Sequence, residues 1–245
     1  MKNLFKTKFD VAVIVLIPAC IGINYLGKLF ASVLKLPLWL DSIELMKKDV
    51  NTQNPLSGAV YGIYTDKKCE NLLMTMSATG TDGKAVSDYF DSALKTVYVK
   101  EITAPTGYKL NTEVYKVAVT AGKTMTVTAT DERVTGKVKI AKIDKETLAF
   151  KAQGDSVLRG AVYGLYAKED IVHPDGTTGV LYKQDSLIAQ GVIGDDGTLE
   201  FSELYLGEMY VKEITPPEGY TLDTTKYLLH TDHTQHHEEH CPPAL

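Results

Sequence analysis

One nine-residue stretch occurs twice in the sequence, and it constrains the fold more than any other feature. It reads Lys-Glu-Ile-Thr-Ala-Pro-Thr-Gly-Tyr over 100–108 and Lys-Glu-Ile-Thr-Pro-Pro-Glu-Gly-Tyr over 212–220. Each copy follows a strand-like run; proline then ends ladder pairing and glycine supplies a turn. Because side chains alternate along a strand, Glu101 and Glu213 share a face with the preceding apolar residues. A carboxylate on such a face is costly to bury unless it is protonated or paired, so the sequence predicts a partner for each glutamate.

The composition excludes several classes of function. The 245-residue chain has a net charge of −5, so it lacks the basic footprint of a nucleic-acid-binding protein. Its three cysteines, Cys20, Cys69 and Cys241, are widely spaced and odd in number, which argues against a disulfide framework. Nothing in the sequence calls for a cofactor, and none is expected.

The N-terminal residues form an apolar leader with a basic start. The run from Val11 to Gly27 is borderline in length for a bilayer span, and the lysines before it predict an inside N-terminus. A signal-anchor helix and a cleavable signal peptide both fit this pattern. Ile-Gly-Ile-Asn-Tyr from Ile21, with Leu-Pro-Leu-Trp-Leu-Asp-Ser-Ile from Leu36, resembles the first membrane helix of substrate-binding subunits of energy-coupling-factor vitamin transporters. That resemblance leaves open a transporter-subunit fragment fused to passenger domains.

Beyond the leader the chain repeats itself on the scale of a domain. Gly-Ala-Val-Tyr-Gly-Ile-Tyr, ending at Tyr64, returns as Gly-Ala-Val-Tyr-Gly-Leu-Tyr, ending at Tyr166. Alternating strand patterns, separated by short turns, favour a mainly β fold of two tandem Ig-like sandwiches, the second incomplete, after an N-terminal hydrophobic helix. The expected domains are a leader (1–42), a first sandwich (43–136), a second, incomplete sandwich (137–229) and a His-rich tail (230–245).

The alternation of side chains along a strand also directs one lysine in the first strand of each repeat toward the core. The core-facing positions are Ile43, Leu45 and Lys47 in repeat one and Val138, Ile140 and Lys142 in repeat two. In the last strand of repeat one, Asp131 shares a face with apolar residues. Three strands therefore direct Lys47, Glu101 and Asp131 inward. The alternative is that these are strand-end charges that reach solvent.

Three convergent ionisable groups predict a covalent bond that forms once. A buried lysine loses its proton more easily, and a buried carboxyl gains one. The neutral amine of Lys47 is then a nucleophile beside the carboxyl of Asp131, and Glu101 can polarise the carbonyl and move protons. The product is a Lys–Asp isopeptide bond with release of water, so the protein is not expected to be a turnover enzyme.

The combined motifs resemble the collagen-adhesin B-type, prealbumin-like domains of Gram-positive SpaA-type pilins over about residues 43–229. The motifs are Lys-x-Asp, then Gly-Ala-x-x-x-Leu/Ile-Tyr, then Glu-x-x-Ala/Pro-Pro-x-Gly-Tyr. The resemblance implies that Lys47 is joined to Asp131 with Glu101 as the catalytic residue. Aspartate here replaces the asparagine that is commoner in the family.

Repeat two carries the lysine and the glutamate but departs from the family at the acceptor. By resemblance, Lys142 is the isopeptide-forming lysine and Glu213 the catalytic residue. In repeat one the acceptor lies 16 positions after Tyr115, whereas 16 positions after Tyr227 is Pro243, in a tail without strand alternation. The sequence therefore predicts a Lys142–Glu213 ion pair, no isopeptide bond and an unpaired sheet edge in repeat two, in a fused, truncated or frame-shifted chain.

The tail holds five of the six histidines. Histidine binds transition metals, but the spacing fits no catalytic motif, so the tail is expected to be a disordered polar end that binds metal only incidentally.

The resemblance implies a structural or adhesive protein of the Gram-positive cell surface, membrane-anchored or secreted. Expected partners are other surface or pilus subunits, host matrix, and the membrane through the leader. A carbohydrate- or host-matrix-binding module is the alternative, and it requires an exposed aromatic platform. The candidate tyrosines alternate between two faces and are Tyr61, Tyr64, Tyr163 and Tyr166.

Overall fold

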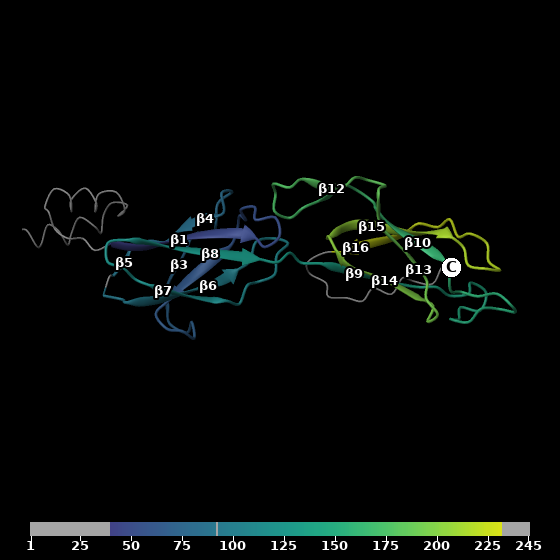
Figure 1. The fold of residues 1–245 in the computed structure, drawn as a ribbon, viewed down its shortest axis with the longest axis horizontal. Coiled ribbons are helices and arrows are strands. Elements are labelled where there is room, and N and C mark those ends of the chain that lie inside the picture. Colours follow the sequence, from purple (N-terminus) through teal and green to yellow (C-terminus); the bar gives the residue numbers. More distant parts are fainter. Residues whose placement is uncertain (1–39, 92, 232–245) are drawn as a thin grey trace, which may run out of the picture. The chain divides into compact units, whose positions relative to one another are not determined.

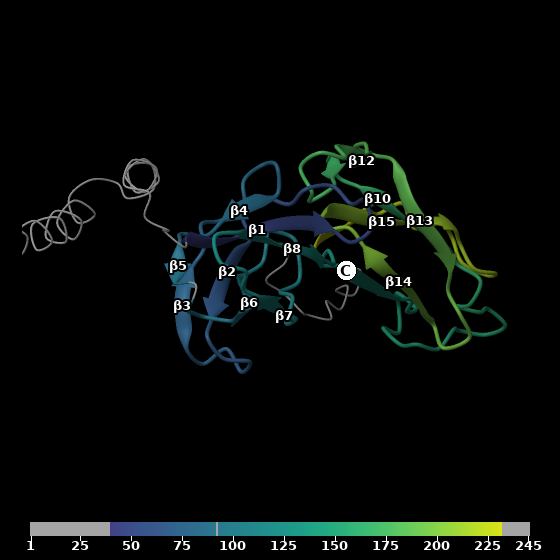
Figure 2. The same ribbon diagram turned by 60° about the vertical axis from the view of Figure 1, so that its left-hand side comes forward.

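The computed structural model describes residues 40–91 and 93–231, and all regular elements in these ranges are β-strands (Figure 1, Figure 2). Within them, no helix is long and apolar enough to cross a membrane. The segment predicted as a leader helix and nearly all of the His-rich tail lie outside the described residues, as do the membrane, transporter and metal-binding interpretations that depend on them.

The chain divides into two compact units. Among the described residues, one unit holds the chain up to Met46 with 59–103 and 112–129, and the other holds 47–58, 104–111 and the chain from Thr130. Two separate apolar cores form, one within strands β1–β8 (the first sandwich) and one within β9–β16 (the second sandwich).

The first sandwich consists of two four-stranded sheets. In one, β1 pairs with each of three other strands; the members are β1 (Leu40–Asp49), β4 (Lys84–Val86), β5 (Phe90–Asp91) and β8 (Thr124–Asp131). In the other, the order is β3 (Leu72–Thr75), β2 (Val60–Tyr64), β6 (Thr96–Thr103) and β7 (Val114–Ala118). Alternation places the apolar residues of both sheets inward, and Ile43, Leu45 and Val99 are fully buried. Burying each such side chain contributes roughly 1.5–3 kcal/mol.

The second glycine of the repeated Gly-Ala-Val-Tyr-Gly-x-Tyr stretch lies against the ring of the tyrosine two positions later. A Cβ on Gly62 would lie 2.7 Å from Tyr64 Cε2, and a Cβ on Gly164 would lie 2.6 Å from Tyr166 Cε2. Residues two apart in a strand share a face, so each tyrosine ring lies back over the glycine of its own strand. The recurrence of glycine at this position in both repeats follows from that contact.

The second sandwich repeats the order of the first with fewer pairings. Its larger sheet has the order β13 (Leu187–Val192), β10 (Val162–Ala167), β15 (Gly207–Thr215) and β16 (Tyr227–Thr231). Its smaller sheet pairs β9 (Gly136–Ala141) with β14 (Thr198–Leu204), and a separate hairpin joins β11 (Ile171–Val172) to β12 (Val180–Tyr182). In the described part of the chain, β9 pairs with β14 alone, whereas β1 pairs with β8 as well.

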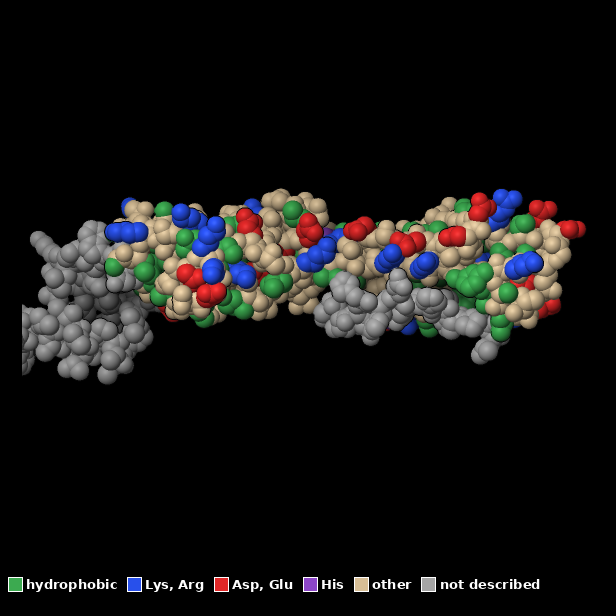
Figure 3. Space-filling view, turned by 90° about the horizontal axis from the view of Figure 1, so that it is seen from below, with side chains coloured by type: hydrophobic (Ala, Val, Ile, Leu, Met, Phe, Trp, Pro, Cys, Tyr) green, Lys and Arg blue, Asp and Glu red, His purple; other side chains and the backbone are tan. Residues whose placement is uncertain are grey.

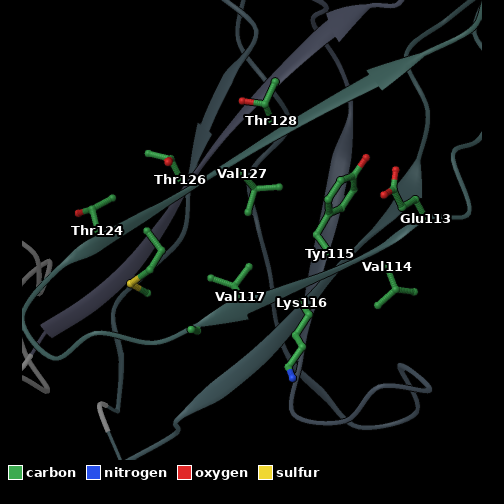
Figure 4. A pocket seen from close by; sticks show the side chains of 11 residues that line it. Glu113, Val114, Tyr115, Lys116, Val117, Thr124, Thr126, Val127 and Thr128 are labelled. Atoms are coloured by element: carbon green, nitrogen blue, oxygen red, sulfur yellow. The ribbon is translucent and has the colours of Figure 1, made fainter.

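The last strand of the first sandwich is attached along one edge. Strand β8 pairs with β1 and with no other strand of the described residues. A hollow of about 660 Å³ lies between β8 and β7, the end strand of the other sheet (Figure 4). Figure 4 shows Tyr115, Val117 and Val127 between the two strands, and both valines are buried. Backbone pairing therefore ties β8 to the fold through β1.

Candidate cross-linking site

Lys47 and Asp131 meet in the first sandwich. Lys47 lies near the end of β1 and Asp131 ends β8, so the pairing of these two strands brings them together. Lys47 Nζ donates to Asp131 Oδ1, and both side chains are 0% exposed. Next to them, Val50 N donates to Asp131 O at 3.0 Å, which fixes the backbone at the end of β8. The alternative that these charges reach solvent is wrong.

Glu101 is also buried, as the alternation of side chains along its strand predicts. It is 2% exposed and lies on β6, on the face that carries Val97 and Val99. Its backbone partner across the β2–β6 pair is Tyr61, which is fully buried. The structure thus places all three predicted site residues of repeat one in its interior; their chemical roles stay predictions.

Repeat two contains the anticipated ion pair. Lys142 directly follows β9, and its Nζ lies 2.8 Å from Glu213 Oε1 and 3.2 Å from Tyr163 OH. The other carboxylate oxygen, Glu213 Oε2, accepts a 2.8 Å hydrogen bond from Asp223 N. Burial and the charge of Glu213 raise the pKa of Tyr163 far above its usual value, so its hydroxyl keeps its proton. Both oxygens of the buried glutamate are therefore satisfied.

One position near the lysine differs in chemistry between the repeats. In repeat one, Asn111 Nδ2 donates a 2.9 Å hydrogen bond to the carbonyl oxygen of Thr130 in β8. The matching position in repeat two is Asp223, whose Oδ2 accepts 2.6 Å from the hydroxyl of Tyr227. A carboxylate cannot donate to a carbonyl, so this position does not hold a last strand as the asparagine does.

Sequence reasoning missed a second pair of residues in each repeat. Tyr108 OH donates a 2.7 Å hydrogen bond to Asp49 Oδ2, and Tyr220 OH donates a 2.8 Å hydrogen bond to Asp144 Oδ2. The second oxygen of each aspartate caps the following turn; Asp49 Oδ1, for example, accepts 2.8 Å from Thr52 N. These bonds tie the end of the lysine-bearing segment to the end of the glutamate-bearing stretch. The recurrence of Lys-x-Asp and Gly-Tyr in both repeats was the available signal.

The four tyrosines considered for a carbohydrate platform differ in burial, and Tyr64 and Tyr166 are the partly exposed ones. Tyr61 and Tyr163 are buried in their cores. Tyr166 stacks on Tyr210 with ring centroids 5.2 Å apart, and Lys226 Nζ lies 4.2 Å above the Tyr210 ring. The face in Figure 3 shows basic and acidic side chains interspersed. In the described chain, no group of three His, Cys, Asp or Glu side chains is placed to hold a metal ion.

The fold and its two lysine sites define a protein built from tandem prealbumin-like β-sandwiches. The SpaA prealbumin-like fold domain family matches residues 41–133 and again residues 136–239. The chain belongs to this family, in two tandem copies, which confirms the resemblance to SpaA-type pilin domains.

Individual relatives are similar to parts of this chain. The trypsin-resistant surface T6 protein of Streptococcus pyogenes serotype M6 is 36% identical over 75 residues, which is 31% of this chain and 13% of the relative. The solved structure of the Bacillus anthracis TIE protein is 22% identical, with a TM-score of 0.57 over 79% of this chain and 31% of the other. A streptococcal ancillary pilin is 18% identical, with a TM-score of 0.38 over 80% of this chain and 59% of the other. The chain thus spans less than a third of the length of the first two, and the structural likeness shows the fold alone.

Proposed function

We propose that this chain is part of a pilin-like or adhesive protein of the Gram-positive cell surface, and that its first sandwich is locked by an isopeptide bond between Lys47 and Asp131. The carrying observation is the fully buried contact between Lys47 Nζ and Asp131 Oδ1. Two desolvated charges in contact are poor stabilisers compared with apolar packing, so their presence in the core favours a chemical role.

The reaction begins with transfer of a proton within the buried pair. Burial favours the neutral amine and the neutral carboxylic acid. The lone pair of Lys47 Nζ attacks Asp131 Cγ, the C–N bond forms, the C–OH bond breaks and water leaves. Glu101 hydrogen-bonds the carboxyl during the attack and passes the amine proton to the leaving hydroxyl.

The second repeat supports the role of Glu101. Glu213 occupies the same place in the repeated nine-residue stretch, and its Oε1 lies 2.8 Å from Lys142 Nζ. A glutamate at this position thus reaches the core lysine of its own sandwich. The condensation happens once per molecule, so the protein is not a turnover enzyme.

The bond would connect the first and last strands of the sandwich. Lys47 and Asp131 are 84 residues apart, and β8 pairs with β1 alone in the described chain. Closing a loop of this length stabilises the fold by roughly 4–5 kcal/mol in the chain-entropy model. A covalent tie between terminal strands also resists pulling along the chain, which suits a surface fibre or adhesin. Other surface or pilus subunits and host matrix are the proposed partners, with the chain membrane-anchored or secreted.

Intact mass spectrometry of single variants tests the proposal. The parent chain is expected to weigh one water less than its sequence mass. Lys47→Ala, Glu101→Ala and Asp131→Ala should each show the full mass of the variant sequence. Lys48→Ala changes the neighbouring lysine, on the opposite face of β1, and should keep the deficit. A parent chain at full mass contradicts the proposal.

A further inference from the structure

In the described chain, repeat two carries a hairpin that has no counterpart in repeat one. In repeat one, β2 is followed by β3, its neighbour in the sheet, whereas in repeat two β11 and β12 come between β10 and its neighbour β13. The tip of the hairpin reads His-Pro-Asp-Gly-Thr-Thr over 173–178, yet His173 is only 4% and Asp175 only 8% exposed. Buried polar groups need hydrogen-bond partners, and the tip finds them on the turn that follows β1 (residues 50–56, the β1 turn).

The carboxylate of Asp175 joins the hairpin tip to the β1 turn. Its Oδ1 accepts hydrogen bonds of 2.9 and 2.8 Å from the backbone N–H groups of Thr177 and Thr178, which close the tip. Its Oδ2 accepts a 2.9 Å hydrogen bond from Asn54 Nδ2 and a 3.2 Å hydrogen bond from Thr52 Oγ1. One oxygen therefore shapes the hairpin, and the other holds two side chains of the β1 turn.

A second contact of the tip lies one residue earlier. A Cβ on Gly107 would lie 2.8 Å from Pro174 Cβ, so the proline packs directly against this glycine. The next residue is Tyr108, whose hydroxyl donates to Asp49 just before the β1 turn. All of these residues belong to the compact unit that the chain from Thr130 forms with two segments of repeat one. The tip thus lies against both sides of the tyrosine–aspartate contact of repeat one.

The charge of Asp175 persists despite its burial. Burial alone would raise its pKa, but hydrogen bonds from Thr178 and Asn54 hold that pKa well below its usual value. Hydrogen bonds to an ionised acceptor are stronger than those to a neutral one, so the grip on the β1 turn is firm. Burial raises the pKa of Tyr108, and the negative charges of Asp175 and Asp131 raise it further. Both carboxylates are therefore close enough to act on the same hydroxyl.

The β1 turn is bonded to the backbone of both reacting residues. Val50 N donates to Asp131 O at 3.0 Å, and Leu56 N donates to Lys47 O at 3.0 Å. A shift of the turn therefore changes the separation between Lys47 Nζ and the side-chain carbonyl carbon of Asp131. A misplacement of about 1 Å can slow a reaction between oriented groups about 100-fold.

We propose that Asp175 is a positioning residue for the condensation of Lys47 with Asp131. Its carboxylate holds the β1 turn, and the β1 turn holds the backbone of both reacting residues. It takes no part in the bond chemistry, in which the C–N bond forms and water leaves as described above. Asp175 comes from repeat two, so the cross-link in repeat one depends on a folded hairpin in repeat two. The inference rests on the proposed function, because it concerns the same condensation.

The test follows the intact mass of the full chain over time after cell-free synthesis and scores the fraction that has lost one water. Asp175→Ala should slow this loss on the order of 10-fold, because the β1 turn loses its fixed position. Asn54→Ala removes the other side of the same hydrogen bond and should slow it similarly, and the double variant should be no slower than the slower single variant. Asp170→Ala removes an exposed carboxylate at the base of the same hairpin, 2.8 Å from Lys183 Nζ, and should leave the rate unchanged.

An exchange of the two side chains separates positioning from a loss of folding. Asp175→Asn combined with Asn54→Asp restores a donor and an acceptor across the same contact with their roles reversed. The exchanged chain should therefore recover most of the rate that Asp175→Asn alone loses. Far-UV circular dichroism of each variant should show the sheet content of the parent chain, so that a slow variant is one that has kept its fold.

The same time courses separate this inference from the proposed function. A parent chain that loses water while Asp175→Ala and Asn54→Ala lose it equally fast overturns the positioning role and leaves the Lys47–Asp131 bond standing. A parent chain that never loses water overturns the bond and the positioning role with it. Slow single variants without recovery in the exchanged chain would also overturn the assignment to Asp175.

Discussion

Lys142 Nζ lies 2.8 Å from Glu213 Oε1 while the glutamate side chain is fully buried, so repeat two keeps an ion pair at its core lysine. In repeat one the core lysine contacts an aspartate of the last strand. The same sequence pattern therefore supports two arrangements. Among the described residues, a strand with a core-facing carboxyl lies beside the first strand in repeat one, and β9 of repeat two pairs with β14 alone.

The buried pair of repeat two should be more costly to break than to replace. Removing one partner leaves the other charge buried and uncompensated, so we expect Lys142→Met alone to destabilise the second sandwich by about 3–5 kcal/mol. The double variant Lys142→Met/Glu213→Leu should recover most of that loss. Denaturant unfolding of both variants measures the difference. A double variant as unstable as the sum of its single changes would show that the pair is not a buried, isolated one.

Asp223 makes the second sandwich sensitive to acid. Burial alone would raise the pKa of Asp223, but hydrogen bonds from Thr225 and Tyr227 and the charge of Lys142 lower it to about 2. The unfolded value is about 3.9, so the folded state binds fewer protons than the unfolded state. This stabilisation is complete above about pH 4 and is lost as the pH falls toward 2. Asp223→Asn should remove that part of the pH dependence, as measured by thermal unfolding between pH 5 and 2 (roughly the window set by these values). Equal slopes for the two proteins would contradict the assignment.

The glycine–tyrosine contact in each repeat predicts a specific pattern of non-additivity. Gly62→Ala places a methyl group against the Tyr64 ring, and overpacking of this kind costs about 1–3 kcal/mol. In Gly62→Ala/Tyr64→Ala the ring is absent, so the alanine at 62 should add little to the cost of losing the tyrosine. A double-mutant cycle by denaturant unfolding gives the coupling energy. Additive costs would show that the ring moves aside freely.

Hydrogen exchange should distinguish the first strands of the two sandwiches. Strand β1 pairs on both sides with β4, β5 and β8, whereas β9 pairs with β14 alone in the described chain. Amides of β9 that face away from β14 should therefore exchange faster than their counterparts in β1. Exchange followed by peptide-level mass spectrometry compares residues 138–141 with 43–46. Equal protection would mean that another segment covers β9.

The alternation of side chains along single strands was enough to predict the cores and much of the candidate site. Once Ile43 and Leu45 are assigned to the interior, Lys47 follows, and the structure buries all three. The same argument placed Glu101 and Asp131 inward. Alternation is a local property of the backbone, so it survives without knowledge of the strand order.

Contacts that depend on tertiary geometry could not be derived in this way. The bond from Tyr220 to Asp144 joins residues 76 positions apart, and the bond from Asp223 N to Glu213 depends on the course of a loop. Loop conformation is set by the sum of many weak interactions, which leaves no periodic trace in the sequence. Only the recurrence of Lys-x-Asp and Gly-Tyr marked the tyrosine–aspartate contact, and it did not reveal which atoms meet.

The most direct test of the central claim is peptide mapping of the unmodified chain by tandem mass spectrometry after proteolysis. We predict one branched species in which the peptide containing Lys47 is joined through Nζ to the side-chain carbonyl of Asp131, with a mass one water below the sum of the two peptides. Asp131→Asn should give the same branched product with loss of ammonia instead of water. Recovery of the two peptides as separate linear species, each at its full mass, would contradict the account.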